Sequence, residues 1–312
     1  MSSGARQIVQ YAVETVNGTT PIPFARKTLP FVDTSLDQTA NKTDSASIKS
    51  GRIASQGAIT SKTVEGDLNV EAEFATYDDL IAAAAFNTWA EGATEDDPEV
   101  LTFGGTTRQS LSILRGYEDI AEYYTFAGVH VNTFTLDIPE EGIVTFGFGL
   151  MGKSRVHVSN TAPTGTVTPA DDKPKISSVG VGDILVDGTS VVGVACISAL
   201  SFEWDNQAQV QRCLGNGGDV GAIIEGMANG TGTVTMAWSK KGAELLEKQF
   251  NNGLVSFVIP FGDSLGNQYK LTPPQVEITG SLPSGSGEDI LQASIEYRVV
   301  NQAPTLERLA AV

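Results

Sequence analysis

The sequence predicts a mainly β protein made of two tandem lobes, each a β-sandwich or barrel with one flanking α-helix. Two observations indicate this class. Short runs of alternating apolar and polar residues are separated by Gly, Pro, Asn and Asp, and glycine accounts for 33 of the 312 residues. A unit of one strand followed by one helix also occurs twice, at 66–86 and 230–250, which indicates an internal duplication.

The first copy of the unit has the sequence GDLNVEAEFATYDDLIAAAAF and begins with a strand pattern. Leu68, Val70 and Phe74 alternate with polar residues, the period of two that is typical of a half-buried antiparallel strand. Thr76 is expected to cap the following helix, because a hydroxyl can accept a hydrogen bond from a first-turn N–H. The apolar stripe of that helix consists of Tyr77, Leu80, Ile81, Ala84 and Ala85.

The second copy, GTGTVTMAWSKKGAELLEKQF, repeats this order 164 residues later. Val234, Met236 and Trp238 alternate with small polar residues, so a second half-buried strand is expected. Ser239 is the expected helix cap, and both copies end in Phe-Asn. The two copies share order and pattern more than identity.

The remaining segments set the expected domain boundaries. Strand-like runs joined by turn signals such as PEEG follow each helix, and a Thr- and Pro-rich stretch separates the two copies. The expected boundaries are an N-terminal arm at 1–45, a first lobe at 46–154, a linker at 155–180, a second lobe at 181–300 and a C-terminal tail at 301–312. The arm, the linker and an acidic loop at 91–99 are expected to contact neighbouring chains, since long segments without structure of their own usually have an external role.

The net charge of −17 argues against a tight nucleic-acid binder, which should carry basic patches. No signal-peptide core and no apolar run of membrane-spanning length occurs, so we expect synthesis in a cytoplasm-like compartment and no membrane association. Cys196 and Cys213 lie without a C-x-x-C motif. Two free thiols are the expectation in a reducing cell, although the sequence leaves a disulfide open.

One segment, GFGLMGKS at 147–154, matches the pattern of a phosphate-binding loop that ends in Lys153 and Ser154. Such a loop must run directly into a helix whose N-terminus faces the phosphates. Here the apolar alternation continues through the glycines and no helix pattern follows, so we interpret the segment as a strand.

No other pattern indicates catalysis. The two histidines, His130 and His157, have no cysteine or acidic residues around them at the spacing of metal ligands. No G-x-S-x-G nucleophile motif occurs. We therefore expect no enzymatic activity, no cofactor and no metal.

The polar side of the first repeated strand is more informative. Asp67, Glu71 and Glu73 would place three carboxylates on one side of the strand, whereas the second copy offers threonines. This side faces either bulk water or a water-filled channel, and the pattern alone does not separate the two.

These segments resemble the tail tube, or major tail, proteins of long-tailed bacteriophages. The resemblance covers roughly residues 25–300. Its clearest segments are GDLNVEAEFATYDDLIAAAAFNTW, RQSLSILRGYEDIAEYYTFAGVHVNTFTLDIPEEGIVTFGFGLMG and ISALSFEWDNQAQVQRCLG followed by the second copy.

The resemblance implies a structural virion protein that assembles in the cytoplasm of a bacterial host. Members of this family form rings of six lobes that stack into a hollow tube through which double-stranded DNA leaves the virion. Two lobes per chain would close such a ring with three chains, giving a pseudo-sixfold homotrimer. The implied partners are further copies of the chain and the tape-measure, tail terminator and tail-tip proteins. Asp67, Glu71 and Glu73 are then the expected lumen-facing acids.

Two other functions fit parts of the sequence. The first is a nucleotide-binding protein that uses the segment at 147–154, and the second is an adhesin or binding module of two β-sandwich domains. A nucleotide-binding protein requires a helix after Lys153, and a binding module would stay monomeric at high concentration.

Overall fold

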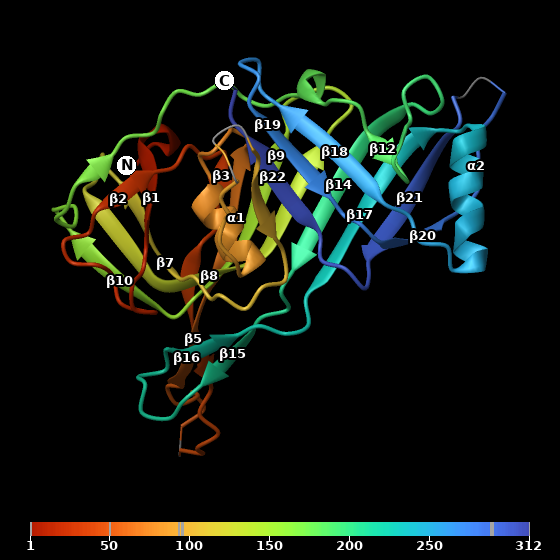
Figure 1. Ribbon diagram of the computed structural model, residues 1–312. Coiled ribbons are helices and arrows are strands. Elements are labelled where there is room, and N and C mark those ends of the chain that lie inside the picture. Colours follow the sequence, from red (N-terminus) through yellow and green to blue (C-terminus); the bar gives the residue numbers. More distant parts are fainter. Residues whose placement is uncertain (1, 50, 93, 95–96, 288–289, 312) are drawn as a thin grey trace.

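The computed structural model describes residues 2–49, 51–92, 94, 97–287 and 290–311. Over these residues the chain forms 22 β-strands and two α-helices, which confirms the predicted mainly β class. The strands lie in one large and two smaller sheets, none of which closes into a barrel in these described segments. Figure 1 shows the long strands of both halves running side by side through the body.

Eight strand positions of the large sheet form a repeated series, four from each half. In the first half these are β3–β4 (Asp33–Thr34 and Asp37–Thr43), β5 (Ala58–Glu71), β9 (Thr145–Gly152) and β8 (Glu122–Ile138), in that spatial order. In the second half they are β14 (Ile197–Asp205), β17 (Asn229–Ala237), β21 (Gln292–Val299) and β20 (Val276–Gly280). In each half, the last two of the four strands along the chain appear in the opposite order in the sheet. This shared order is the arrangement expected of a duplicated unit.

The two halves join through a strand pair inside the large sheet. β8 pairs antiparallel with β14, with Ile138 opposite Leu200 and Thr133 opposite Asp205. Backbone hydrogen bonds thus continue across the boundary between the halves, so no sheet edge is left exposed there.

The predicted arm and linker both contain strands of the first half. β1 (Gln7–Val13) pairs with β7 (Leu111–Tyr117) along seven residues and buries Val9 and Tyr11. β10 (Ser154–Ser159), at the start of the predicted linker, pairs with β8. The sheet is extended by β2 (Arg26–Thr28) and β11 (Val167–Thr168). These strands are part of the large sheet. The predicted lobe boundaries at 46–154 and 181–300 stay a prediction.

A second sheet of six strands packs behind the large sheet. Its spatial order is β13 (Thr189–Ser190), β12 (Leu185–Val186), β18 (Phe257–Gly262), β19 (Gln268–Thr272), β22 (Thr305–Leu309) and β6 (Glu99–Thr102). β22 lies in the predicted tail, and its partner β6 comes from the first half. The first half therefore contributes one strand to a sheet of second-half strands, which a division into two separate lobes does not anticipate. Of the predicted acidic loop at 91–99, residues 93, 95 and 96 lie outside the described residues.

Helix α1 (Asp78–Ala85) begins after Tyr77, and α2 (Lys240–Glu247) begins after Ser239. The Ser239 hydroxyl accepts a hydrogen bond from the Gly242 N–H at 3.2 Å, as predicted. The predicted Thr76 cap is wrong, since the hydroxyl of Thr76 is buried without a hydrogen-bond partner. Ala75 has a left-handed φ of 59°, so the chain turns just before the helix, and Tyr77 rather than Thr76 occupies the N-cap position. Short 3₁₀ turns occur at Gly4–Arg6, Ser178–Gly180 and η3 (Lys248–Asn251).

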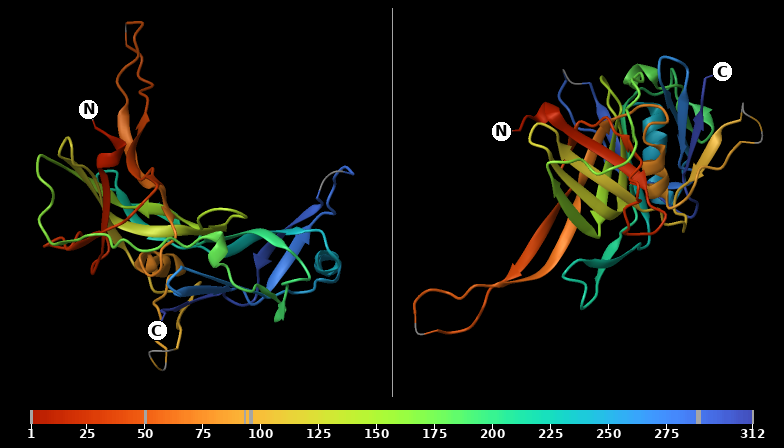
Figure 2. Two further views of the ribbon diagram at one scale, coloured as in Figure 1. Left: turned by 90° about the horizontal axis from the view of Figure 1, so that it is seen from above. Right: turned by 90° about the vertical axis from the view of Figure 1, so that its left-hand side faces the viewer.

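Two hairpins extend below the body in Figure 1, and Figure 2 shows that the longer one also points away to one side. One is the long β4–β5 hairpin, and the other is formed by β15 (Gln209–Arg212) and β16 (Val220–Ile224). They are fixed together because Arg212 donates to the Lys62 carbonyl at 2.6 Å and Lys62 forms an ion pair with Asp219 at 3.1 Å.

Candidate functional site on the open face of the large sheet

The large sheet has one buried face and one exposed face, because side chains alternate along each strand. The buried face carries aromatic and aliphatic rows that continue across strands, such as Phe148, Phe134 and Trp204 on β9, β8 and β14. Phe103, which follows β6, packs on this row with ring centroids 5.4 to 6.0 Å from Phe134 and Trp204. The core thus fixes which side chains remain on the other face.

The opposite side, here called the open face, is polar along rows that cross both halves. One row runs through Glu71, Thr145, Asp137, Ser201, Thr233, Glu296 and Thr279. The next row runs through Asn69, Gly147, Thr135, Glu203, Thr231, Arg298 and Glu277. A third row runs through Asp67, Gly149, Thr133, Asp205 and Asn229. Because all these positions share the pleat, their side chains form one continuous surface.

The open face is acidic. Its three rows hold seven carboxylates and one guanidinium, and that guanidinium, Arg298, is paired with Glu277 at 2.8 Å. Partial burial raises the pKa of the Asp137 carboxyl above its ordinary value. Apart from the charges, the rows consist of threonine, serine, asparagine and glycine, so the surface has small, hydrated side chains and no aromatic platform.

Two positions of β9 on this surface require glycine, because threonine side chains occupy the space that a Cβ atom would need. A Cβ on Gly147 would collide with the Thr135 hydroxyl, and one on Gly149 would collide with the Thr133 hydroxyl. Both threonines lie directly opposite these glycines on β8. The open face is therefore smooth at its centre.

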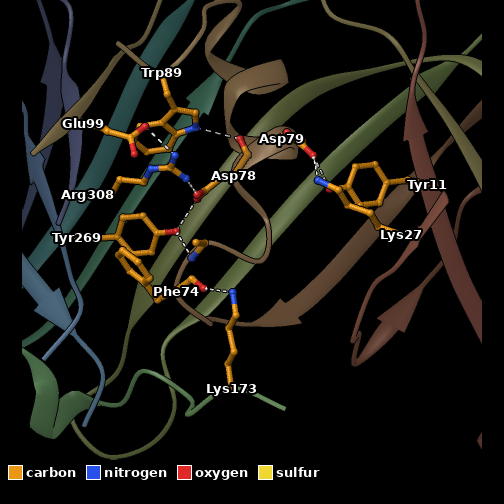
Figure 3. A network of polar contacts seen from close by, with 11 residues as sticks. Tyr11, Lys27, Phe74, Asp78, Asp79, Trp89, Glu99, Lys173, Tyr269 and Arg308 are labelled. Carbon is orange, nitrogen blue, oxygen red and sulfur yellow. Dashed lines mark hydrogen bonds and ion pairs between the residues drawn. The ribbon is translucent and has the colours of Figure 1, made fainter. Parts of the chain in front are cut away.

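Contacts around α1 hold the sheet from behind, as Figure 3 shows. The Asp78 carboxylate accepts a hydrogen bond from the Tyr269 hydroxyl at 2.6 Å and forms an ion pair with Arg308, whose pKa is lowered by burial. Arg308 also pairs with Glu99 at 2.7 Å and lies over the Trp89 ring, 4.7 Å from its centroid. Tyr269 and Arg308 come from the second half, so this network locks the two halves together.

A family model described as phage tail tube protein matches residues 4–299 of this chain. The chain belongs to the phage tail tube protein family. A comparison with curated proteins gave no match. This match confirms the family expected from the sequence. A tail tube protein is a structural component of the virion, which agrees with a non-enzymatic role.

The three acids expected on one face of this tail tube protein separate in the structure. Asp67 is exposed on the open face, and Glu71 lies at its margin, 3.7 Å from the Lys175 ammonium group. Glu73 is only 2% exposed and forms an ion pair with Lys175. β5 ends at Glu71. The alternation of side chains between the two faces therefore stops before Glu73, and Glu73 does not reach the open face.

Most acids of the open face come from strands that the sequence analysis did not use for the site. Asp137, Glu203 and Glu296 all occupy polar positions of alternating runs, in FTLDI, SFEWD and SIEYR. The signal was therefore present, but their common surface depends on the pairing of β8 with β14, which a single sequence does not reveal.

The phosphate-loop match lies in two consecutive strands, β9 and β10, and no helix follows Lys153. The Lys153 N–H donates to the Ala127 carbonyl at 3.0 Å, as part of the sheet. The strand interpretation of this segment in the tail tube protein is confirmed.

The histidines and cysteines form no site among the described residues, where no group of three potential metal ligands occurs. His130 is 2% exposed, its Nε2 lies 3.0 Å from the Asn17 amide nitrogen, and burial lowers its pKa to about 4. His157 contacts Glu122 at the surface. Cys196 and Cys213 are exposed free thiols. No helix within the described ranges has the length and hydropathy to cross a membrane.

Proposed function

We propose that three copies of this tail tube protein close into a ring, that the rings stack into the tail tube, and that the open face lines the lumen through which genomic DNA passes. Assembly would take place in the cytoplasm of the bacterial host. The proposed partners are further copies of the chain and the tape-measure, tail terminator and tail-tip proteins.

The observation that carries the ring proposal is the repeated strand order of the large sheet. One chain supplies eight strand positions, four from each half, and the halves are already joined by an antiparallel pair. Three chains would supply 24 positions. With strands about 4.8 Å apart and tilted by about 40°, such a wall has a circumference of about 150 Å and a backbone diameter of about 48 Å. A DNA duplex fits inside after the side chains are added.

The charge of the open face supports passage rather than binding. Proteins hold DNA by placing Lys and Arg on the phosphates, and single strands are held by aromatic stacking platforms. The three rows of the open face instead present seven carboxylates, one paired guanidinium and no exposed aromatic ring. Because screening at physiological salt limits the repulsion to about 8 Å, the wall repels phosphates only when DNA comes close to it. DNA would then slide without adhering.

Asp67 remains a proposed lumen acid, joined by Asp137, Glu203 and Glu296, with Glu71 at the margin. The buried Glu73 serves the packing around Lys175 instead. Contacts between rings and chains are proposed for 1–45, 91–99 and 155–180, together with the two projecting hairpins shown in Figure 2.

Electron microscopy of the concentrated full-length protein tests this function. We expect rings or tubes about 100 Å across, the wall diameter plus about one sandwich thickness on each side. Image classes with threefold symmetry and six similar lobes would support three chains per ring. A protein that remains monomeric by sedimentation at millimolar concentration would contradict the proposal and favour a binding module.

A further inference from the structure

Deepening the proposed ring function, we infer that the surface formed by β20, α2 and η3 binds the β3–β4 edge of a second copy, in the way β8 binds β14 within one chain. The partner is thus the first half of the next chain. The inference rests on the proposed function, which supplies the second copy in the ring. Four structural observations indicate which surfaces and residues meet.

The first observation concerns the two ends of the eight-strand series in the large sheet. Among the described residues, β3 and β4 pair only with β5. The outer edge of β20 carries only an isolated bridge between Val276 and Val255 and the Gln249 side chain, which accepts from the Gly280 N–H at 3.4 Å. Unpaired edges of this kind are templates for another chain. Counting along the antiparallel ladder, β20 runs in the same direction as β8, and β4 in the same direction as β14. A β20–β4 pair between copies would therefore be antiparallel, as β8–β14 is.

The second observation fixes which residues meet. Thr135 of β8 faces Glu203 of β14, and its own row leads through Gly147 to Asn69. The repeat spacing of 164 residues places Thr233 at the position of Asn69, and the row of Thr233 leads through Glu296 to Thr279. Thr279 therefore corresponds to Thr135.

The other side of the contact follows in the same way. Glu203 pairs with Thr231, which corresponds to Asp67, and Ser35 is the outer neighbour of Asp67, with its N–H donating to the Asp67 carbonyl at 2.9 Å. Ser35 therefore corresponds to Glu203. The next residue of each strand agrees, because the Leu36 backbone lies beside Gly66 and Trp204 lies opposite Gly230. We infer that Thr279 of one copy lies opposite Ser35 of the next.

The third observation is the difference in burial between the two helices. Seven of the eight α1 residues are buried, partly because Asn206, Tyr269 and Arg308 of the second half cover the helix. Only three of the eight α2 residues are buried. Phe86, which ends the first repeated unit, is 3% exposed, whereas Phe250, which ends the second, is 74% exposed. Among the described residues, side chains of the other half thus cover α1, and no comparable segment covers α2.

The fourth observation is the charge at the helix N-termini. Asp78 and Asp79 in the first turn of α1 pair with Arg308 and Lys27. α2 instead begins with Lys240 and Lys241, whose ammonium groups have no hydrogen bond or ion pair with the described residues and face the positive end of the helix dipole. Residues 1–154 carry 10 basic and 21 acidic side chains, so the first half of a second copy is strongly acidic. Lys240 and Lys241 are therefore opposite in charge to that half.

Disulfide trapping tests the register directly. In a Cys196→Ser and Cys213→Ser background, Ser35→Cys and Thr279→Cys are combined, and the assembled protein is oxidised and run on a non-reducing gel. Facing residues of antiparallel strands have Cα atoms about 5 Å apart, within disulfide range. We expect covalent dimers and closed trimers. The matched control combines Thr279→Cys with Asn41→Cys, which lies about 20 Å further along the edge, and should remain uncrosslinked.

The outcomes separate this inference from the function it rests on. Rings in the microscope without crosslinks, or with equal crosslinking of the control, would overturn the proposed junction and leave the tube function standing. A monomeric cysteine-free parent would overturn both.

A second variant tests the helix surface without relying on cysteines. Phe250→Ser should lower ring formation at least tenfold in sedimentation experiments while leaving the far-ultraviolet spectrum and melting temperature unchanged, because this side chain makes little contact within its own chain. The control is Leu265→Ser, 65% exposed in the β18–β19 turn away from α2. Normal assembly of Phe250→Ser would contradict the inference.

Discussion

The Tyr269 hydroxyl donates a 2.6 Å hydrogen bond to Asp78, a residue 191 positions earlier in the chain. The same hydroxyl accepts a hydrogen bond from the Ala75 N–H at 2.9 Å, at the turn that leads into α1 (Figure 3). Burial raises the pKa of Tyr269, which keeps the hydroxyl protonated as a donor. One side chain of the second half thus fixes both the helix start and the turn of the first half.

Replacing Tyr269 by Phe should destabilise the protein by about 1–3 kcal/mol, because the half-buried Ala75 N–H and the buried Asp78 carboxylate both lose a partner. Urea unfolding followed by fluorescence measures this change. Tyr123→Phe is the matched control, since the structure gives that hydroxyl no hydrogen bond to a described residue, and it should stay within about 0.5 kcal/mol of the parent. Equal stability of the two variants would contradict a locking role for Tyr269.

Asn206→Ala should cost about 2–3 kcal/mol. The buried Asn206 amide donates to the Ala84 carbonyl at 2.8 Å and the Asn132 carbonyl at 3.1 Å, and accepts from the Trp204 indole N–H at 3.0 Å. Its removal leaves the Trp204 donor buried without a partner. Thermal unfolding is the measurement. Asn41→Ala, an exposed asparagine of β4, should lie within about 0.5 kcal/mol of the parent; a comparable loss there would mean that the measurement reports something other than the buried amide.

Stability should fall between pH 6.5 and pH 4 because of His130. Its pKa is lowered from 6.5 to about 4 by burial, so the unfolded chain binds a proton in this interval that the folded chain does not. Folding is therefore fully favoured above pH 6.5 and loses about 3 kcal/mol as the pH falls to 4. Denaturant unfolding across this range measures the loss.

His130→Asn should flatten that pH dependence, whereas Asn17→Ala, which removes the hydrogen-bond partner and retains the histidine, should keep it. An unchanged slope in His130→Asn would show that other groups cause the loss of stability.

Reversing charge on the open face should convert a non-adhesive surface into a DNA-binding one. Glu203→Lys combined with Glu296→Lys changes the charge of each chain by +4, or +12 for a ring of three. We expect assembled tubes of this variant to retain short duplex DNA at low salt and to release it as salt rises. Filter binding measures the retention.

The control for charge reversal is Glu118→Lys with Glu141→Lys, two exposed acids outside the three rows of the open face. This pair carries the same charge change and should leave DNA retention at the parent level. If both variants bind DNA equally, net charge rather than the open face governs the effect.

Several elements followed from the sequence because their determinants are local. The alternating pattern of β5 and β17, the Ser239 cap and the extended conformation of GFGLMGKS depend on residues a few positions apart. The failure at Thr76 has the opposite cause, because the turn before α1 is fixed by Tyr269 from the other half of the chain. The place of Glu73 likewise depends on Lys175, about a hundred residues later.

By itself, the sequence determined the mainly β class, the duplicated unit, the acidic balance and the resemblance to tail tube proteins, since periodicity, repeats and charge can be counted along one chain. Only the tertiary structure decided that β8 pairs with β14, that β6 joins the sheet of the second half, and that carboxylates from both halves share one open face. The physical reason is that strand pairing is satisfied by any suitable edge, so its choice depends on how distant segments pack together rather than on the residues of one strand.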